Sequence, residues 1–120
     1  LASPFGYYNE HVLTEVAKHY DSHVNAWSDT NGINRWATLD LMNINRWTIR
    51  NTDTSEAVCK KMSKLADDEV FVIAIHDVTK VEPKLEREYD ISEKTLRELI
   101  ICSNEQKKLY FRIKDLVGAR

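Results

Sequence analysis

Glycine and proline are scarce in this chain, and their scarcity restricts the folds it can adopt. The 120 residues include three glycines and two prolines, about 4% of the chain where average usage is about 12%. Collagen-like and Pro/Gly-rich disordered chains are excluded, and an all-β fold is disfavoured because tight hairpins need residues that tolerate positive φ. Gly6, Gly32 and Gly118 also cannot form a GxGxxG or GxxxxGK[ST] phosphate loop or a GxSxG nucleophile turn.

The charge balance is close to neutral. Lys and Arg total 17 and Asp and Glu total 19, which gives a net charge of −2 at pH 7. The chain therefore has no global basic field that could hold nucleic acid by counter-ion release. Its longest apolar run, residues 70–75, is far shorter than the roughly 20 residues needed to span a bilayer. We expect a soluble globular chain with one core and no membrane span within it.

No linker, low-complexity tract or charge block divides the sequence, so we expect one domain over residues 9–120. Because the chain begins with Leu1 rather than methionine, residues 1–8 are interpreted as an N-terminal tail or a vector-derived remnant. The domain could belong to a larger cytoplasmic or extracytoplasmic protein. A membrane anchor upstream of Leu1 is an open alternative.

Cys59 and Cys102 are the two cysteines of the chain. They form no CxxC motif, so the sequence predicts no structural zinc site. Each lies beside an apolar residue, which favours buried free thiols over the one disulfide that the pair could form. The cysteines therefore leave the redox compartment open.

Apolar residues at three- and four-residue spacing predict two helices in the first half of the chain. The first covers residues 9–27, with Asn9 as its N-cap. The second covers residues 54–66, where Asp53 can cap the helix and Glu56 can complete a capping box.

Two more helices are expected towards the C-terminus. The third covers residues 93–101 after Ser92. The last is predicted because residues 103–106 have a capping-box spacing and Gly118 follows the final apolar residues. Residues 108–113 also alternate between polar and apolar side chains, as a strand would. The capping-box spacing, the terminal glycine and the helical spacing of the apolar residues nevertheless favour a helix. The residues expected to face inward from the third helix are Leu96, Leu99 and Ile100.

The best strand is predicted over residues 69–79. Its centre, residues 70–75, is apolar on both faces, as in a central strand. The strand is expected to continue to Val81, because Pro83 then ends its ladder of hydrogen bonds.

Residues 33–51 contain a short repeat, Asn34-Arg35-Trp36 and Asn45-Arg46-Trp47. An eleven-residue spacing is about three helical turns, whereas strand residues an odd number apart point to opposite faces. The β-branched and aromatic residues favour an extended segment over residues 39–50, with a helical turn before it.

The elements together predict a single α+β domain, with three or four helices packed on a small sheet centred on residues 70–75. Their order is similar to that of PAS-like and GAF-like sensor domains, and to the soluble domains that phage holins and bacterial receptors carry after a membrane helix. This is an analogy of layout without shared motifs, and it assigns no function.

Four side chains recur every four residues in the first expected helix: His11, Glu15, His19 and His23. On a continuous helix such a row shares one face, so two imidazoles and a carboxylate could bind a metal. The row lacks an HExxH motif, and it also fits half-exposed histidines beside an apolar stripe. No metal or other cofactor is expected, and these four residues are the candidates for a metal site.

Catalysis has little support in the sequence. His76 and Asp77, after the predicted central strand, are the best acid–base candidates, but no nucleophile with a base and an orienting group can be assembled. A basic face formed by Lys107, Lys108, Arg112, Lys114 and Arg120 is typical of a solvated helix surface. We therefore assign no catalytic residues and expect a protein that is not an enzyme.

The repeat carries the favoured contact surface, because tryptophan and arginine dominate interface hot spots. Buried tryptophans with arginines at the rim would be the structural alternative. We expect a non-catalytic binding or regulatory domain that acts through a protein partner or a small ligand. Alternatives are an extracytoplasmic sensory domain that oligomerises on signal, a metal-dependent enzyme, and a single-stranded nucleic-acid binder. Of these three, the nucleic-acid binder is disfavoured. The residues of the predicted contact surface are Arg35, Trp36, Arg46, Trp47 and Arg50.

Overall fold

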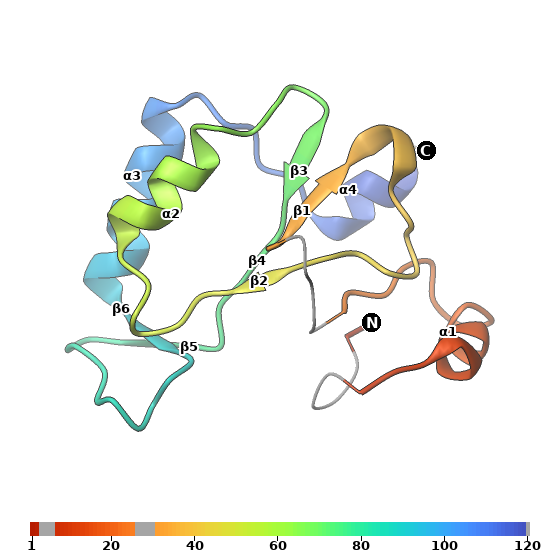
Figure 1. The fold of residues 1–120 in the computed structure, drawn as a ribbon, viewed down its shortest axis with the longest axis horizontal. Helices are drawn as coiled ribbons and strands as arrows, with labels where there is room; N and C mark the ends of the chain where they lie inside the picture. The colour runs from red at the N-terminus through yellow and green to blue at the C-terminus, as the bar shows by residue number, and fades with distance from the viewer. Residues whose placement is uncertain (3–6, 26–30, 120) are drawn as a thin grey trace. The chain divides into compact units, whose positions relative to one another are not determined.

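The computed structural model describes residues 1–2, 7–25 and 31–119, and it has the α+β class expected from the sequence (Figure 1). Helices and short two-stranded sheets follow one another along these residues. In chain order the elements are α1 (Glu10–Val16), β1 (Ile33–Arg35), the 3₁₀ turn η2 (Trp36–Thr38), β2 (Trp47–Thr48), α2 (Ser55–Met62), β3 (Glu69–Phe71), β4 (Ile73–Ala74), β5 (Asp77–Thr79), β6 (Asp90–Ser92), α3 (Glu93–Glu105) and α4 (Ile113–Gly118).

Tertiary contacts divide the chain into two compact units, which are described in turn. Unit 1 contains Leu1–Trp47, Asp68–Val72 and Tyr110–Arg120. Unit 2 contains Thr48–Asp67 and Ile73–Leu109. Neither unit is a continuous stretch of sequence, so each depends on segments that are distant in the chain.

The first helix of unit 1 is much shorter than the sequence predicts. Asn9 caps it as expected, since its Oδ1 accepts a hydrogen bond from the Val12 N–H at 2.9 Å. The helix ends at Val16 rather than at residue 27, and residue 27 lies outside the described residues. Tertiary pairing overrides the helical periodicity, because the backbone from His23 onward bonds to another segment of unit 1 instead of to the preceding turn.

That pairing joins residues 23–25 to residues 41–44. The His23 N–H donates to the Leu41 carbonyl at 2.8 Å, and the His23 carbonyl accepts from the Ile44 N–H at 3.0 Å. On the other side, the Val24 N–H donates to the Leu1 carbonyl at 2.8 Å. The first residue of the predicted tail therefore takes part in the hydrogen bonding of unit 1.

Unit 1 also contains the antiparallel pair β1 and β3, in which Ile33 lies opposite Phe71 and Arg35 opposite Glu69. Gly32 precedes β1 with a φ of 81°, in the region that favours glycine. The η2 turn directly after β1 matches the helical turn expected before the extended segment. The buried apolar side chains of unit 1 are Val16, Leu39, Ile44 and Leu116.

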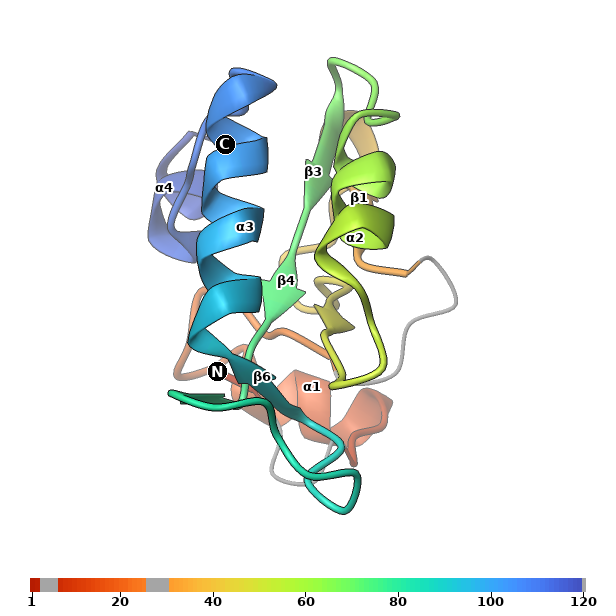
Figure 2. The ribbon, with the colours of Figure 1, turned by 90° about the vertical axis from the view of Figure 1, so that its left-hand side faces the viewer.

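Unit 2 contains the two-stranded sheet of β5 and β6, which pair in parallel with Val78 opposite Ile91. Figure 2 shows β6 running directly into α3. Ser92 caps α3 as predicted, because its Oγ accepts from the Thr95 N–H at 3.2 Å. The buried apolar side chains of unit 2 are Ile49, Val58, Met62, Ile91 and Leu99.

Helix α2 is shorter than predicted, and its cap is Thr54 rather than Asp53. The Thr54 hydroxyl accepts from the Ala57 N–H at 3.2 Å, whereas the Asp53 carboxylate accepts from the Arg50 N–H at 2.8 Å and closes the preceding turn. Of the apolar residues whose spacing predicts this helix (Val58, Met62 and Leu65), the first two are buried, and Leu65 lies beyond the end of the helix.

Helix α3 continues to Glu105, so the predicted helix start at residues 103–106 is wrong. Ser103 lies inside α3, where its hydroxyl donates to the Ile100 carbonyl at 3.1 Å. Ile100, which the helical period places inward, is instead 47% exposed. The last helix is confirmed only as the short α4, which begins after the Arg112 cap.

The predicted strand over residues 69–79 is divided into β3, β4 and β5. Of these, β3 belongs to unit 1 and the other two belong to unit 2. The Val72 N–H donates to the Gly32 carbonyl at 2.9 Å, so the interruption after Phe71 leaves this backbone group paired. The predicted strand therefore contributes one short strand to each of the two-stranded sheets among the described residues, instead of forming one long central strand.

Candidate functional site

The histidine row predicted from four-residue spacing is not assembled. His11 and Glu15 lie on α1, but His19 follows the end of that helix and all three are exposed. Glu15 pairs with Lys18 at 2.6 Å. Within residues 1–2, 7–25 and 31–119, no group of three or more His, Cys, Asp or Glu side chains is placed to hold a metal ion.

His23, the last member of that row, is fully buried in unit 1. Its Nδ1 lies 3.1 Å from the Met42 carbonyl oxygen, and its ring packs edge-on against Tyr8 with centroids 5.2 Å apart. Burial lowers the pKa of His23 below its ordinary value, and the positive charge of Arg46 acts in the same direction. His23 is therefore a neutral core residue that ties residues 23–25 to residues 41–44.

The second predicted site, the tryptophan–arginine surface, is divided between the two units. Trp36 and Trp47 are both half-buried in unit 1, and Trp47 packs against Phe71 with ring centroids 5.8 Å apart. Arg35 is exposed and lies 3.8 Å from Glu69. The tryptophans are thus neither fully buried core residues nor fully exposed contact residues.

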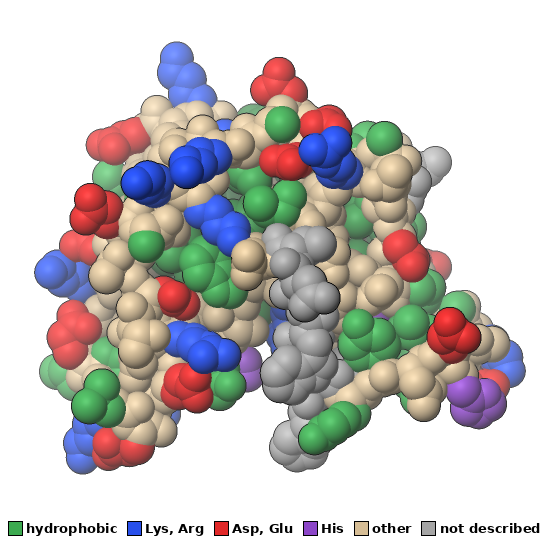
Figure 3. All heavy atoms as spheres, viewed as in Figure 1, with side chains coloured by type: hydrophobic (Ala, Val, Ile, Leu, Met, Phe, Trp, Pro, Cys, Tyr) green, Lys and Arg blue, Asp and Glu red, His purple; other side chains and the backbone are tan. Residues whose placement is uncertain are grey.

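Arg50 belongs to unit 2, where its guanidinium pairs with Glu88 at 2.9 Å and lies 5.7 Å from the centre of the Tyr89 ring. On the face shown in Figure 3, basic side chains are mixed with acidic ones. The pairing of Arg35 with Glu69 and of Arg50 with Glu88 reduces the positive charge that is available to bind a nucleic acid.

The repeat that contains the tryptophans is organised by its asparagines. The Asn34 side chain is buried, and its Nδ2 donates to the Asn45 carbonyl at 2.9 Å. Its Oδ1 accepts from the Asn45 N–H at 2.8 Å. One side-chain amide therefore satisfies both backbone groups of the equivalent asparagine in the second copy, as a neighbouring strand would.

Asn25 connects this pair to a wider network. It is buried, and its Nδ2 donates to Oδ1 of Asn43 at 2.8 Å and to Oδ1 of Asn45 at 2.9 Å. The Tyr8 hydroxyl donates to the same Asn43 oxygen at 3.1 Å. Both oxygens are thereby held by donors, which fixes the orientation of the two amide planes. The Nδ2 groups of Asn43 and Asn45 donate to no described residue.

Asn43 and Asn45 line a cleft in unit 1 with a volume of about 520 Å³. The cleft brings together groups of opposite charge and several hydrogen-bonding groups. Asp40 contributes a carboxylate that uses one oxygen, Oδ1, to accept from the Met42 N–H at 2.9 Å. We call this the asparagine cleft, and its lining residues are Ile33, Asn34, Arg35, Thr38, Leu39, Asp40, Asn43, Asn45 and Glu69.

The asparagine cleft offers groups that can hydrogen-bond a polar molecule. It offers amide N–H donors, a guanidinium and carboxylates, but its described lining includes no histidine, cysteine or lysine. The predicted acid–base pair lies in unit 2, where Asp77 is engaged by Arg87 at 3.2 Å and His76 packs near the Tyr89 ring at 5.2 Å. No hydrogen bond joins His76 to Asp77 among the described residues.

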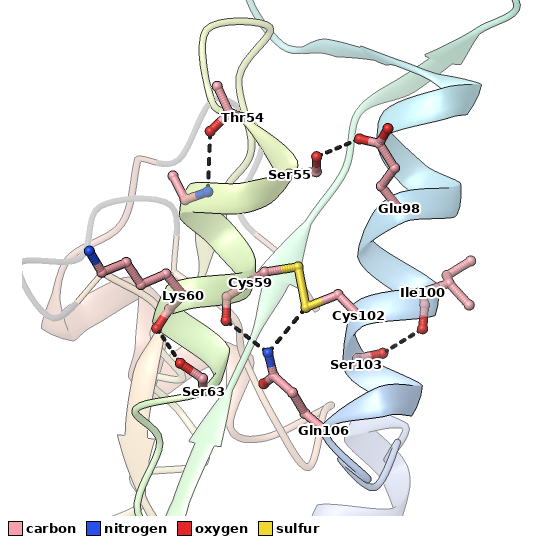
Figure 4. Close-up of a disulfide and its surroundings, with 11 residues drawn as sticks. Thr54, Ser55, Cys59, Lys60, Ser63, Glu98, Ile100, Cys102, Ser103 and Gln106 are labelled. Carbon is pink, nitrogen blue, oxygen red and sulfur yellow. Dashed lines mark hydrogen bonds between the residues drawn. A yellow bond between two sulfur atoms is a disulfide. The ribbon is translucent and has the colours of Figure 1, made fainter.

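Sequence reasoning missed one feature of the molecule and misjudged another. The first is the asparagine network, whose signal is the density of asparagine between residues 25 and 51. The second is a disulfide between Cys59 of α2 and Cys102 of α3, with Cα atoms 6.1 Å apart (Figure 4). The expectation of free thiols is wrong because the apolar stripes of these two helices bring the cysteines together.

No protein-family model matches the chain, and neither a curated protein nor a solved structure matches it significantly. The layout analogy with sensor domains consequently stays a prediction, and the function must be inferred from the chain's own residues.

Proposed function

We propose that this chain is a non-catalytic binding domain that takes a small polar ligand in the asparagine cleft of unit 1. The observation that carries the proposal is the state of Asn43 and Asn45. Their side-chain oxygens are held by Asn25, while their Nδ2 groups have no acceptor among the described residues, and both residues line the cleft. Donors fixed in a concave site with no internal partner are suited to a ligand that supplies the acceptor.

The charges of the cleft favour a ligand that carries both signs. The Arg35 guanidinium and the two asparagine amides can hydrogen-bond a carboxylate. Asp40 has one carboxylate oxygen, Oδ2, without a described donor and can accept a bond from an ammonium group. A free amino acid or a short peptide terminus has both groups and fits a volume of about 520 Å³. We therefore name amino-acid-like zwitterions as the ligand class.

The test is a titration of ¹⁵N-labelled protein with the free amino acids and with diglycine, followed through the side-chain amide resonances. We expect one or more of them to shift the Asn43 and Asn45 side-chain signals in a saturable way. Binding that shifts only resonances of unit 2, or no shift from any probe at millimolar concentration, would contradict the proposal.

Three variants sharpen the titration. Asn43→Asp keeps the oxygen that Asn25 and Tyr8 contact but replaces the Nδ2 donor by a charged acceptor. Arg35→Gln removes the cleft's guanidinium. We expect each to weaken binding of the zwitterion at least about tenfold. Arg97→Gln is the matched control, because Arg97 is an exposed, ion-paired arginine of unit 2.

A second candidate, an extracytoplasmic sensory domain, is supported by a separate observation. Disulfides persist in oxidising compartments and are rare in the cytosol, and Cys59 is bonded to Cys102. This candidate rests on the disulfide alone, and in the part of the chain that the structure describes no helix could span a bilayer. Thiol alkylation in intact cells before lysis tests it, because two alkylated cysteines would contradict it.

A further inference from the structure

Unit 1 contains a further cleft, which is lined by α4, by the segment 19–24 and by Leu1 and Ala2. Its volume is about 690 Å³, which is within the range of small-molecule sites in proteins. It shares no lining residue with the asparagine cleft. Any ligand of this cleft is therefore bound by a separate set of side chains.

Aliphatic side chains from both sides line this cleft. Ile113 and Val117 are four residues apart, so they lie on the same face of α4, and both are half-buried. Val24 is half-buried on the other side. Leu116, by contrast, is buried in the core of unit 1. An apolar ligand would remove the remaining exposed surface of the three half-buried side chains from water, which favours binding.

Hydrogen bonds hold both sides of the cleft in place. The Val24 N–H donates to the Leu1 carbonyl at 2.8 Å, and the Tyr20 N–H donates to the Val16 carbonyl at 2.9 Å. At the start of α4, the Asp115 carboxylate accepts from the Arg112 N–H at 2.9 Å. Because these segments are already ordered, a ligand loses less affinity to the ordering of the protein.

The charged side chains of the cleft are exposed, so they lie on its solvent side. They are Lys114, Asp21 and, when it is protonated, His19. Neither Lys114 nor Asp21 forms an ion pair within the described part of the chain. Two basic groups and one acidic group favour a ligand with a single negative charge over a doubly charged phosphate.

We propose that this cleft binds a medium-chain aliphatic carboxylate. The hydrocarbon chain packs on Ile113, Val117 and Val24, and the carboxylate pairs with the Lys114 ammonium. This arrangement has the usual form of a small-molecule site, in which apolar contacts supply most of the affinity and a few polar groups fix the orientation. The Asp21 carboxylate repels the ligand and so lowers its affinity. The inference is independent of the asparagine cleft.

The experiment is a titration of the ¹⁵N-labelled whole chain with octanoate, octan-1-ol and octylammonium, each below the concentration at which it forms micelles. We expect octanoate to shift the backbone amide signals of residues 19–24 and 113–118 in a saturable way, and to leave the signals of unit 2 unchanged. Octan-1-ol should bind about threefold more weakly, because it lacks the charge that pairs with Lys114, and octylammonium should be weaker still.

Variants test the two kinds of contact separately. Val117→Asp should lose at least about tenfold in octanoate affinity, because it replaces an aliphatic contact by a negative charge. Lys114→Gln should lose about threefold, and Asp21→Asn should gain a similar factor. The last two residues are exposed, so these variants test the proposal even where Val117→Asp fails to fold. The matched control is Val81→Asp in unit 2, at a side chain that is 74% exposed, and it should bind octanoate as the unmodified chain does.

Three results would overturn the proposal. The first is that octanoate shifts none of the signals of residues 19–24 and 113–118, or binds no more tightly than octylammonium. The second is an unchanged octanoate affinity in Lys114→Gln. The third is a shift of the same signals when the protein concentration is raised without octanoate, since the cleft would then be a surface for a second copy.

Discussion

Asn34 shows how one side chain can replace a strand. Its amide offers a donor and an acceptor at the spacing of a peptide group, and both are used on the backbone of Asn45, at 2.9 Å and 2.8 Å. Because Asn34 is buried, its amide forms these bonds away from water, where leaving a polar group unpaired is costly. The segment that contains Asn45 is thus held in place without a continuous sheet.

Replacing Asn34 by alanine should destabilise the protein by about 2–4 kcal/mol, because both backbone groups of Asn45 lose their partners. Chemical denaturation measures the change. The control is Glu105→Ala at the exposed end of α3, for which a change within about 0.5 kcal/mol is expected. A loss below about 1 kcal/mol for Asn34→Ala would show that the pairing contributes little.

The buried His23 predicts a dependence of stability on pH. Its folded-state pKa is lowered by burial below the ordinary value of 6.5, so below that pH the unfolded chain binds more protons than the folded one. The contribution of neutral His23 is fully present above about pH 6.5 and is lost as the pH falls below it. Denaturation midpoints measured from about pH 8 down to about pH 5 should show a fall that is smaller in His23→Gln.

At the scale of elements, a position where backbone segments approach each other closely does not tolerate a residue with a side chain. A Cβ at Gly32 would lie 2.6 Å from the Trp47 amide nitrogen and 2.7 Å from the Val72 carbonyl oxygen. Both neighbours are backbone atoms in hydrogen bonds of the same unit, so neither can move without breaking a bond. The glycine that the sequence marks only as a turn is therefore a packing requirement of β1.

Gly32→Ala should accordingly destabilise the protein by more than about 1 kcal/mol, through both the positive φ and the clash. Gly118→Ala is the matched substitution, because a Cβ added there would meet no atom within 4 Å and the residue occupies the last turn of α4. It should stabilise the protein by up to about 1 kcal/mol. Thermal denaturation midpoints of the two variants should move in opposite directions.

The disulfide is a covalent constraint between two helices of unit 2. It links α2 to α3 across 43 residues, and the Gln106 Nε2 donates to the Cys59 carbonyl at 3.1 Å beside it (Figure 4). In the chain-entropy model, closing a loop of this length lowers the conformational entropy of the unfolded chain. This stabilises the folded state by about 4 kcal/mol. The double variant Cys59→Ser/Cys102→Ser should lose a free energy of unfolding of that order, measured in urea, and a reductant should then have no further effect.

For the whole molecule, local signals predict the class of fold and several caps. Asn9 and Ser92 cap their helices because a capping bond needs only neighbouring residues. The errors have a tertiary origin. Pairing of His23 with Leu41 and Ile44 overrides the periodicity of residues 9–27 and thereby disperses the histidine row. The asparagine cleft depends on residues that spacing alone does not bring together.

The apolar run over residues 70–75 limits how this chain can be truncated. Because β3 serves unit 1 and β4 serves unit 2, every continuous fragment that contains all of unit 2 also carries Asp68–Val72 away from unit 1. A truncation to residues 1–47 would leave β1 without Phe71 and its other antiparallel partners. The two units are thus covalently interleaved, and neither can be excised for separate study by choosing two cleavage points.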